Sequence, residues 1–131
     1  MEECIRMILI LIWAYWIFES ISEAMTWKSS WWSTYKINPK TYHLIRLPET
    51  LSIMISHLIL SYLLYGWLGV LLGSLCEISG CILYERFYCL KAYNNFFHQK
   101  TSKWLSIPHP KIWMEVVLFV ISLILIIVIG V

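Results

Sequence analysis

The side chains that could do chemistry in this sequence are a few ionisable residues inside long apolar segments. Glu77 and His57 both lie in the apolar stretch 51–90. Glu19 and Glu23 lie near the end of an N-terminal apolar run. Taking a charge into the hydrocarbon part of a bilayer is costly, so ionisable residues at that depth mark candidate ion or proton sites. These four residues therefore form the candidate intramembrane polar site.

Glu19 and Glu23 are four residues apart and so share one face of a helix. Two carboxylates on one face could relay a proton or cation, or ligate a metal. The structural interpretation, which we favour, is that both lie at the headgroup boundary and pair with Lys28 or Arg46. The sequence has no Glu-x-x-His pair, and helical di-metal sites depend on that spacing, so we expect no metal site.

Glu77 has two interpretations, which depend on how the central stretch crosses the membrane. If the stretch forms a hairpin, Glu77 lies in the middle of a span, where its carboxyl group must be neutral or paired with a polar group. If the stretch is one tilted helix, Glu77 is an ordinary interfacial residue. His57 lies near Ser56 and Ser61, and we expect it to form a hydrogen-bonded contact between helices.

The composition predicts an integral membrane protein. Hydrophobic residues make up 60% of the 131 residues and charged residues only 14%, against roughly half and a quarter in soluble domains. The formal net charge of +2 is small and spread over two loops, so we expect no nucleic acid partner. The four cysteines form no CxxC pair, and GxSxG, P-loop, GxGxxG and HExxH motifs are lacking. We therefore expect the lipid bilayer as a partner, no cofactor and no enzymatic activity.

The apolar runs predict an all-α, polytopic fold in a single domain, residues 1–131. Four transmembrane helices are preferred, at about 4–25, 49–65, 68–87 and 112–131, with basic, aromatic-rich interfacial loops at 26–48 and 88–111. We expect Pro48 to begin the second span and Gly66-Trp67 to turn the central hairpin. The hairpin places both basic loops on one side, as the positive-inside rule requires. The alternative is three spans, with one tilted helix from Glu49 to about Cys76.

Gly69 and Gly73 form a GxxxG pair, which is typical of helices that pack closely in membranes. Together with the lack of catalytic motifs, this pair indicates a small accessory or structural subunit of a larger membrane complex, with other membrane protein subunits as partners. The alternative is a small oligomeric transporter or channel that uses intramembrane glutamates for proton or cation coupling. The two functions differ in whether the carboxylates face a cavity or lie at the lipid headgroups. The expected location is a bacterial cytoplasmic membrane or an organellar inner membrane.

Overall fold

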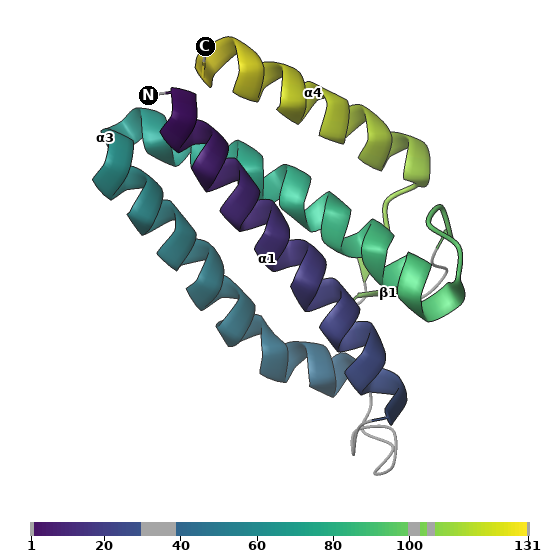
Figure 1. The fold of residues 1–131 in the computed structure, drawn as a ribbon. Coiled ribbons are helices and arrows are strands. Elements are labelled where there is room, and N and C mark those ends of the chain that lie inside the picture. The colour runs from purple at the N-terminus through teal and green to yellow at the C-terminus, as the bar shows by residue number, and fades with distance from the viewer. Residues whose placement is uncertain (1, 30–38, 100–102, 105–106, 131) are drawn as a thin grey trace.

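The computed structural model describes residues 2–29, 39–99, 103–104 and 107–130. Within these ranges the chain is helical, apart from the loop residues 94–99 and 109–111 and two strands of two residues each. The elements in chain order are α1 (Glu2–Ser29), α3 (Pro39–Tyr93), β1 (Lys103–Trp104), β2 (Ile107–Pro108) and α4 (Ile112–Gly130) (Figure 1). In the part of the chain that the structure describes, three segments are long and apolar enough to cross a membrane: Arg6–Ala24, Arg46–Tyr93 and Ile112–Gly130. The predicted all-α class is confirmed, and three helices have the length and composition of membrane spans.

Helix α1 buries one narrow stripe of its surface. The buried residues recur at every fourth position, and each is at most 5% exposed: Ile8, Ile12, Trp16, Ser20 and Ala24. Side chains four apart lie on one face of a helix, and this face packs against α3. The remaining surface of α1 is also largely apolar, as expected of a helix whose surroundings are lipid.

Helix α3 turns back on itself at Gly66, where φ is 63° and ψ is −144°. Glycine adopts this backbone conformation readily, whereas a residue with a Cβ atom is strained in it. The break divides α3 into a first arm, residues 39–65, and a second arm, residues 67–93, which doubles back beside the first (Figure 1). The predicted turn at Gly66-Trp67 is therefore present in the structure.

The predicted bounds of the loop 26–48 are wrong at both ends, because the helices on either side extend into it. Helix α1 extends to Ser29, and α3 begins at Pro39 rather than at Pro48. Proline suits the first turn of a helix, so both prolines satisfy the same local rule for a helix start. Pro48 instead lies inside α3, where its ring removes one backbone donor without ending the helix.

The predicted loop 88–111 also begins as helix, because the second arm of α3 extends to Tyr93. The loop then forms a short antiparallel pair in which Lys103 faces Pro108 and Trp104 faces Ile107. Residues 30–38, 100–102 and 105–106 of the two predicted loops lie outside the described residues.

Gly69 and Gly73, the predicted helix-packing pair, lie against the first arm of the same helix. A Cβ atom at Gly69 would fall 1.9 Å from the backbone oxygen of Ser61, and one at Gly73 would fall 2.7 Å from the Ser61 hydroxyl. Real Cβ atoms do not approach so closely, so a larger residue at either position would push the two arms apart. Ser61 is itself buried, and its hydroxyl donates to the backbone oxygen of His57 at 2.8 Å. The glycine pair therefore allows the two arms of the hairpin to pack closely against each other.

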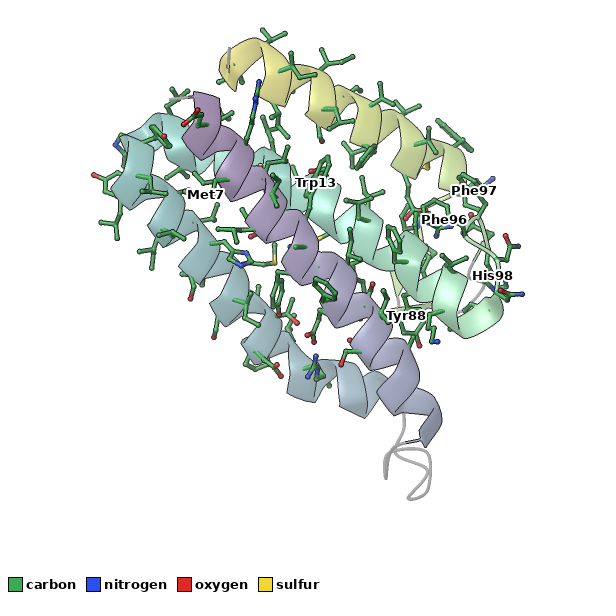
Figure 2. The ribbon with its side chains drawn as sticks, in the orientation of Figure 1. Met7, Trp13, Tyr88, Phe96, Phe97 and His98 are labelled. Carbon is green, nitrogen blue, oxygen red and sulfur yellow. The ribbon has the colours of Figure 1, made fainter. Side chains whose placement is uncertain are left out.

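Helix α4 is attached to the rest of the bundle along one side. Its buried residues are Glu115, Ser122 and Ile126, whose spacing places them on one face. Phe119 stacks on Trp13 of α1, with ring centroids 5.7 Å apart. Figure 2 shows Trp13 on the side of α1 that lies toward α4. The outer surface of α4 is made of exposed valine, isoleucine and leucine side chains.

Replacing Gly66 with alanine is expected to destabilise the hairpin by about 1–3 kcal/mol, because a Cβ atom strains this backbone conformation. The free energy of unfolding can be measured by SDS titration of the purified protein in detergent micelles. Leu63→Ala is the matched control, because the Leu63 side chain lies on the same stretch and is 74% exposed. Equal stability of Gly66→Ala and the wild-type protein would contradict the turn conformation.

Candidate functional site

Glu77 is the most deeply buried of the predicted polar residues, and it lies where three helical segments meet. Its side chain is only 4% exposed. Trp16 of α1 donates its indole N–H to Oε2 of Glu77 at 2.7 Å. The Nδ1 atom of His57, on the first arm of α3, contacts Oε1 of Glu77. Because Glu77 itself lies on the second arm, its carboxylate joins all three segments, and each of its oxygens is engaged.

Ring contacts hold the two partners of Glu77 in place. Tyr15 packs edge-on against both, with ring centroids 5.3 Å from His57 and 5.1 Å from Trp16. Tyr84 of the second arm packs edge-on against Trp16 at 5.9 Å. Such contacts are favourable arrangements of aromatic rings and restrict their rotation. The imidazole and the indole are therefore oriented toward the carboxylate by the packing of the helices.

A second indole on α1 makes a comparable hydrogen bond to an uncharged acceptor. Trp13 donates its indole N–H to the hydroxyl of Ser79 at 2.8 Å. Ser79 is fully buried, and its hydroxyl lies 2.9 Å from the backbone oxygen of Leu75, to which it donates. Helix α1 is therefore fastened to the second arm by two indole hydrogen bonds, one to a carboxylate and one to a hydroxyl.

The carboxylates of Glu19 and Glu23 meet Arg46 of the first arm. Nη2 of Arg46 lies 2.5 Å from Oε1 of Glu19 and 3.7 Å from Oε2 of Glu23. Tyr84 donates its hydroxyl to Glu23, so this group also touches the second arm. Of the two cations that the sequence offers to the pair, Arg46 is the one in contact, whereas the side chain of Lys28 lies outside the described residues. The group is an ion-paired cluster that connects α1 to both arms.

A buried ion pair that the sequence did not reveal joins α3 to α4. Nη2 of Arg86 lies 3.2 Å from Oε2 of Glu115, and both residues are 5% exposed. Nη1 of Arg86 donates to the backbone oxygens of Phe96 and His98, at 3.0 and 3.1 Å, in the loop that follows α3 (Figure 2). A buried charge pair is stable only when such further hydrogen bonds compensate its lost hydration. Glu115 is the only acid in the segment 112–131, which signals the need for a partner but does not identify it.

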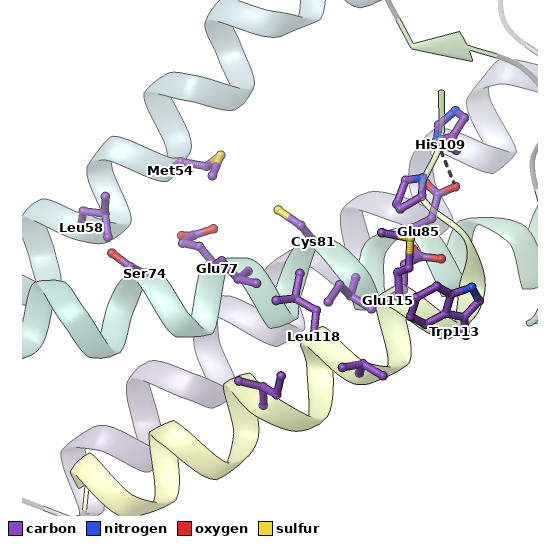
Figure 3. A pocket seen from close by; sticks show the side chains of 16 residues that line it. Met54, Leu58, Ser74, Glu77, Cys81, Glu85, His109, Trp113, Glu115 and Leu118 are labelled. Carbon is purple, nitrogen blue, oxygen red and sulfur yellow. Dashed lines mark ion pairs between the residues drawn. The ribbon is translucent and has the colours of Figure 1, made fainter. Parts of the chain in front are cut away.

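Glu77 also lines a cavity of about 820 Å³ between the two arms of α3 and helix α4 (Figure 3). Cavities of this size are usual for small-molecule sites. His57 contacts Glu77, and a carboxyl group beside an imidazole can exchange a proton with it. Glu19 and Glu23 face Arg46 and do not line this cavity. The structure thus brings His57 together with Glu77, which lines the cavity, and places Glu19 and Glu23 in a separate group around Arg46.

Comparison with protein-family models, with curated proteins and with solved structures finds no match for this chain. What the chain does is therefore inferred from the geometry of its buried polar groups and of its cavity. That geometry has two parts: polar contacts that join the helices, and an apolar cavity with acidic residues in its wall.

Removing the indole donor of Trp16 is expected to cost more than removing that of Trp13. Trp16→Phe deprives a carboxylate of a donor and should lower the free energy of unfolding by about 1.5–3 kcal/mol, the range for hydrogen bonds to charged groups. Trp13→Phe deprives a hydroxyl of a donor and should cost about 0.5–1.5 kcal/mol. Both variants keep an aromatic ring, so SDS titration of the two isolates the contribution of the donor. Equal losses would show that Glu77 does not depend on Trp16.

Proposed function

We propose that the chain crosses the membrane four times, with α1, the two arms of α3, and α4. The reversal at Gly66 supports this topology, because it allows each arm to be a separate span. At 1.5 Å per residue each arm is about 40 Å long, which exceeds a hydrocarbon core of about 30 Å. Four spans place both predicted basic loops on one side of a bacterial cytoplasmic or organellar inner membrane, in agreement with the positive-inside rule.

Within that topology, we propose that the protein is a small accessory or structural subunit of a larger membrane complex. The observation that carries this proposal is that the buried charged groups join the helices to one another. Glu77 links α1 to both arms of α3, and the pair Arg86–Glu115 links α3 to α4. Charged groups used in this way favour one fixed arrangement of helices over an arrangement that opens and closes.

The surface of the bundle suits a subunit surrounded by lipid and by other helices. Large exposed apolar side chains occur on α1, on both arms of α3 and on α4. Helix α4 is the best surface for a partner helix, because only its face with Glu115, Ser122 and Ile126 is buried within the chain. Partner helices and lipid tails can both cover apolar surface of this kind.

A second candidate function is a small oligomeric transporter or channel, and one observation favours it. Glu77 lines the cavity, where a carboxyl group could exchange a proton or bind a cation. Both oxygens of Glu77, however, are engaged by Trp16 and His57, so a transported ion would have to compete with these contacts. We therefore rank transport second.

Single-cysteine labelling distinguishes a topology with four membrane spans from one with three. In a background without native cysteines, Lys36→Cys and Lys100→Cys should react with a membrane-impermeant maleimide from the same side of the membrane. Trp67→Cys, at the turn between the arms, should react from the opposite side. Reaction of the first two variants from opposite sides would contradict four spans and leave three.

Glu77→Gln separates the two functions, because it removes a negative charge and nearly keeps the shape of the side chain. A charged residue in the middle of a bilayer costs roughly 2.5–3.5 kcal/mol, so a neutral glutamine should not weaken assembly. A structural subunit should therefore enter its complex normally as Glu77→Gln, and the wild-type protein should show no proton or cation flux. Assembly can be measured by native gel electrophoresis of the tagged chain after mild extraction from its own membrane, and flux in proteoliposomes.

The control for this experiment is Glu49→Gln, which removes a carboxylate whose side chain is 53% exposed. A wild-type chain that migrates as a monomer would contradict the subunit proposal. Flux that the wild-type protein supports and Glu77→Gln abolishes, with Glu49→Gln unaffected, would establish the transporter in its place.

A further inference from the structure

The contact between His57 and Glu77 has two charge states that differ by one proton. A neutral imidazole beside an ionised carboxylate can form the hydrogen bond, but the pair then carries one net negative charge. One additional proton makes the pair neutral, whether that proton rests on the imidazole or on the carboxyl group. Which of the two states the folded chain adopts depends on what surrounds the pair.

The burial of the pair favours the neutral state. The side chain of Glu77 is only 4% exposed and that of His57 is 19% exposed, so water can offset little of a net charge. The indole N–H of Trp16 donates to the other oxygen of Glu77 at 2.7 Å, but an indole brings no positive charge. Burying an unpaired charge is costly, whereas a buried polar pair that is neutral and hydrogen-bonded is tolerated.

The other titratable groups around the pair add no positive charge. Helix α1 presents the phenol ring of Tyr15, which packs edge-on against His57. The second arm of α3 presents the thiols of Cys76 and Cys81, which lie within electrostatic range of Glu77. Helix α4 presents Glu115, an acid in the wall of the cavity that Glu77 also lines.

The arginines of α3 contact other carboxyl groups. Arg86 lies 3.2 Å from Glu115, and Arg46 contacts three glutamates, which are Glu19, Glu23 and Glu49. Among the described residues, His57 is the only basic side chain in contact with Glu77. A negative charge on the pair would therefore stay unbalanced in the folded chain.

We propose that His57 and Glu77 form a pH-sensitive lock, which holds α1 and the two arms of α3 together while the pair keeps its additional proton. Once that proton is lost, the pair carries a buried negative charge. The cost of this charge falls when the segments separate and water reaches Glu77 through the cavity that it lines (Figure 3). Closing the lock takes up one proton from water, and opening returns it. The inference does not rest on the proposed function, because a structural subunit and a transporter can both contain such a lock.

The lock couples folding to the uptake of a proton. Above about pH 7 an exposed histidine is neutral and an exposed glutamate is ionised, so in the unfolded chain the pair has already lost its additional proton. The folded chain keeps this proton and thus binds one proton more than the unfolded chain. Stability falls with rising pH wherever the folded state binds more protons, and a difference of one proton changes the unfolding equilibrium constant about tenfold per pH unit.

SDS titration of the purified full-length protein at about pH 7 and about pH 8 tests the lock. Over this interval the unfolding equilibrium constant of the wild-type protein should rise about tenfold more than that of Glu77→Gln. Glutamine can still contact Trp16 and His57, but it has no proton to lose at this pH. The groups that titrate elsewhere are the same in both proteins, so the difference between them isolates the pair.

Two further variants separate the proton from the other contacts of Glu77. Glu49→Gln removes a carboxyl group whose side chain is 53% exposed, and it should show the pH dependence of the wild-type protein. Trp16→Phe removes a donor to Glu77 but leaves His57 in contact with it. It should be less stable than the wild-type protein at both pH values and yet keep the same pH dependence.

An equal pH dependence of the wild-type protein and Glu77→Gln would overturn the lock. A direct count of protons gives a second measurement that needs no variant. Unfolding the wild-type protein with SDS in unbuffered solution at about pH 7.5 should release about one proton per chain, which a pH-indicator dye records. Unfolding without proton release would also overturn the lock. Neither result alters migration on native gels, which tests the subunit proposal independently.

Discussion

A carboxyl group inside an apolar bundle needs polar partners, and much of this fold follows from how the bundle supplies them to Glu77. The indole of Trp16 and the imidazole of His57 come from two different segments and reach the two oxygens of one side chain. Losing one partner of a buried polar contact costs more than the contact contributes, because the remaining group stays buried. The contact therefore fixes both the depth and the rotation of three segments relative to one another.

Two further polar contacts extend this principle to the rest of the molecule. Arg46 holds Glu19 and Glu23, and so ties the C-terminal part of α1 to the start of α3. Arg86 and Glu115 tie the later part of α3 to α4. Apolar side chains gain little from leaving lipid for one another, so in a membrane polar contacts and close packing determine which helix faces meet. In these three groups, charged side chains lie between the helices.

The parts of the fold that depend on local rules could be predicted from the sequence. Long apolar runs predicted the helices, and a glycine within a run too long for one span predicted the turn at Gly66. The predicted start of α3 was wrong because Pro39 and Pro48 both satisfy the local rule for a helix start, and that rule does not choose between them. The pair Gly69 and Gly73 predicted close packing, yet nothing in the pattern says that the neighbour is the preceding arm of the same helix.

The partners of the charged residues could not be predicted, because they depend on the rotation of each helix about its axis. Tryptophan is typical of membrane–water interfaces, and nothing in the sequence says that Trp16 donates a hydrogen bond to Glu77. That contact depends on the fold. Glu85 and Arg86 are neighbours in sequence. Adjacent residues point in different directions on a helix, so Arg86 lies nearer to Glu115, at 3.2 Å, than to Glu85, at 3.9 Å.

The contact at Glu77 has a consequence for how the chain is made. Trp16 precedes Glu77 by 61 residues and His57 precedes it by 20, so the ribosome completes both partners before Glu77. In the proposed four-span topology, helix α1 and the first arm would already lie in the bilayer when the second arm enters it. Glu77, the side chain that is most costly to place in lipid, would then be the last of the three to enter. In that topology, the order of synthesis would prevent an unpaired carboxylate from standing in the bilayer.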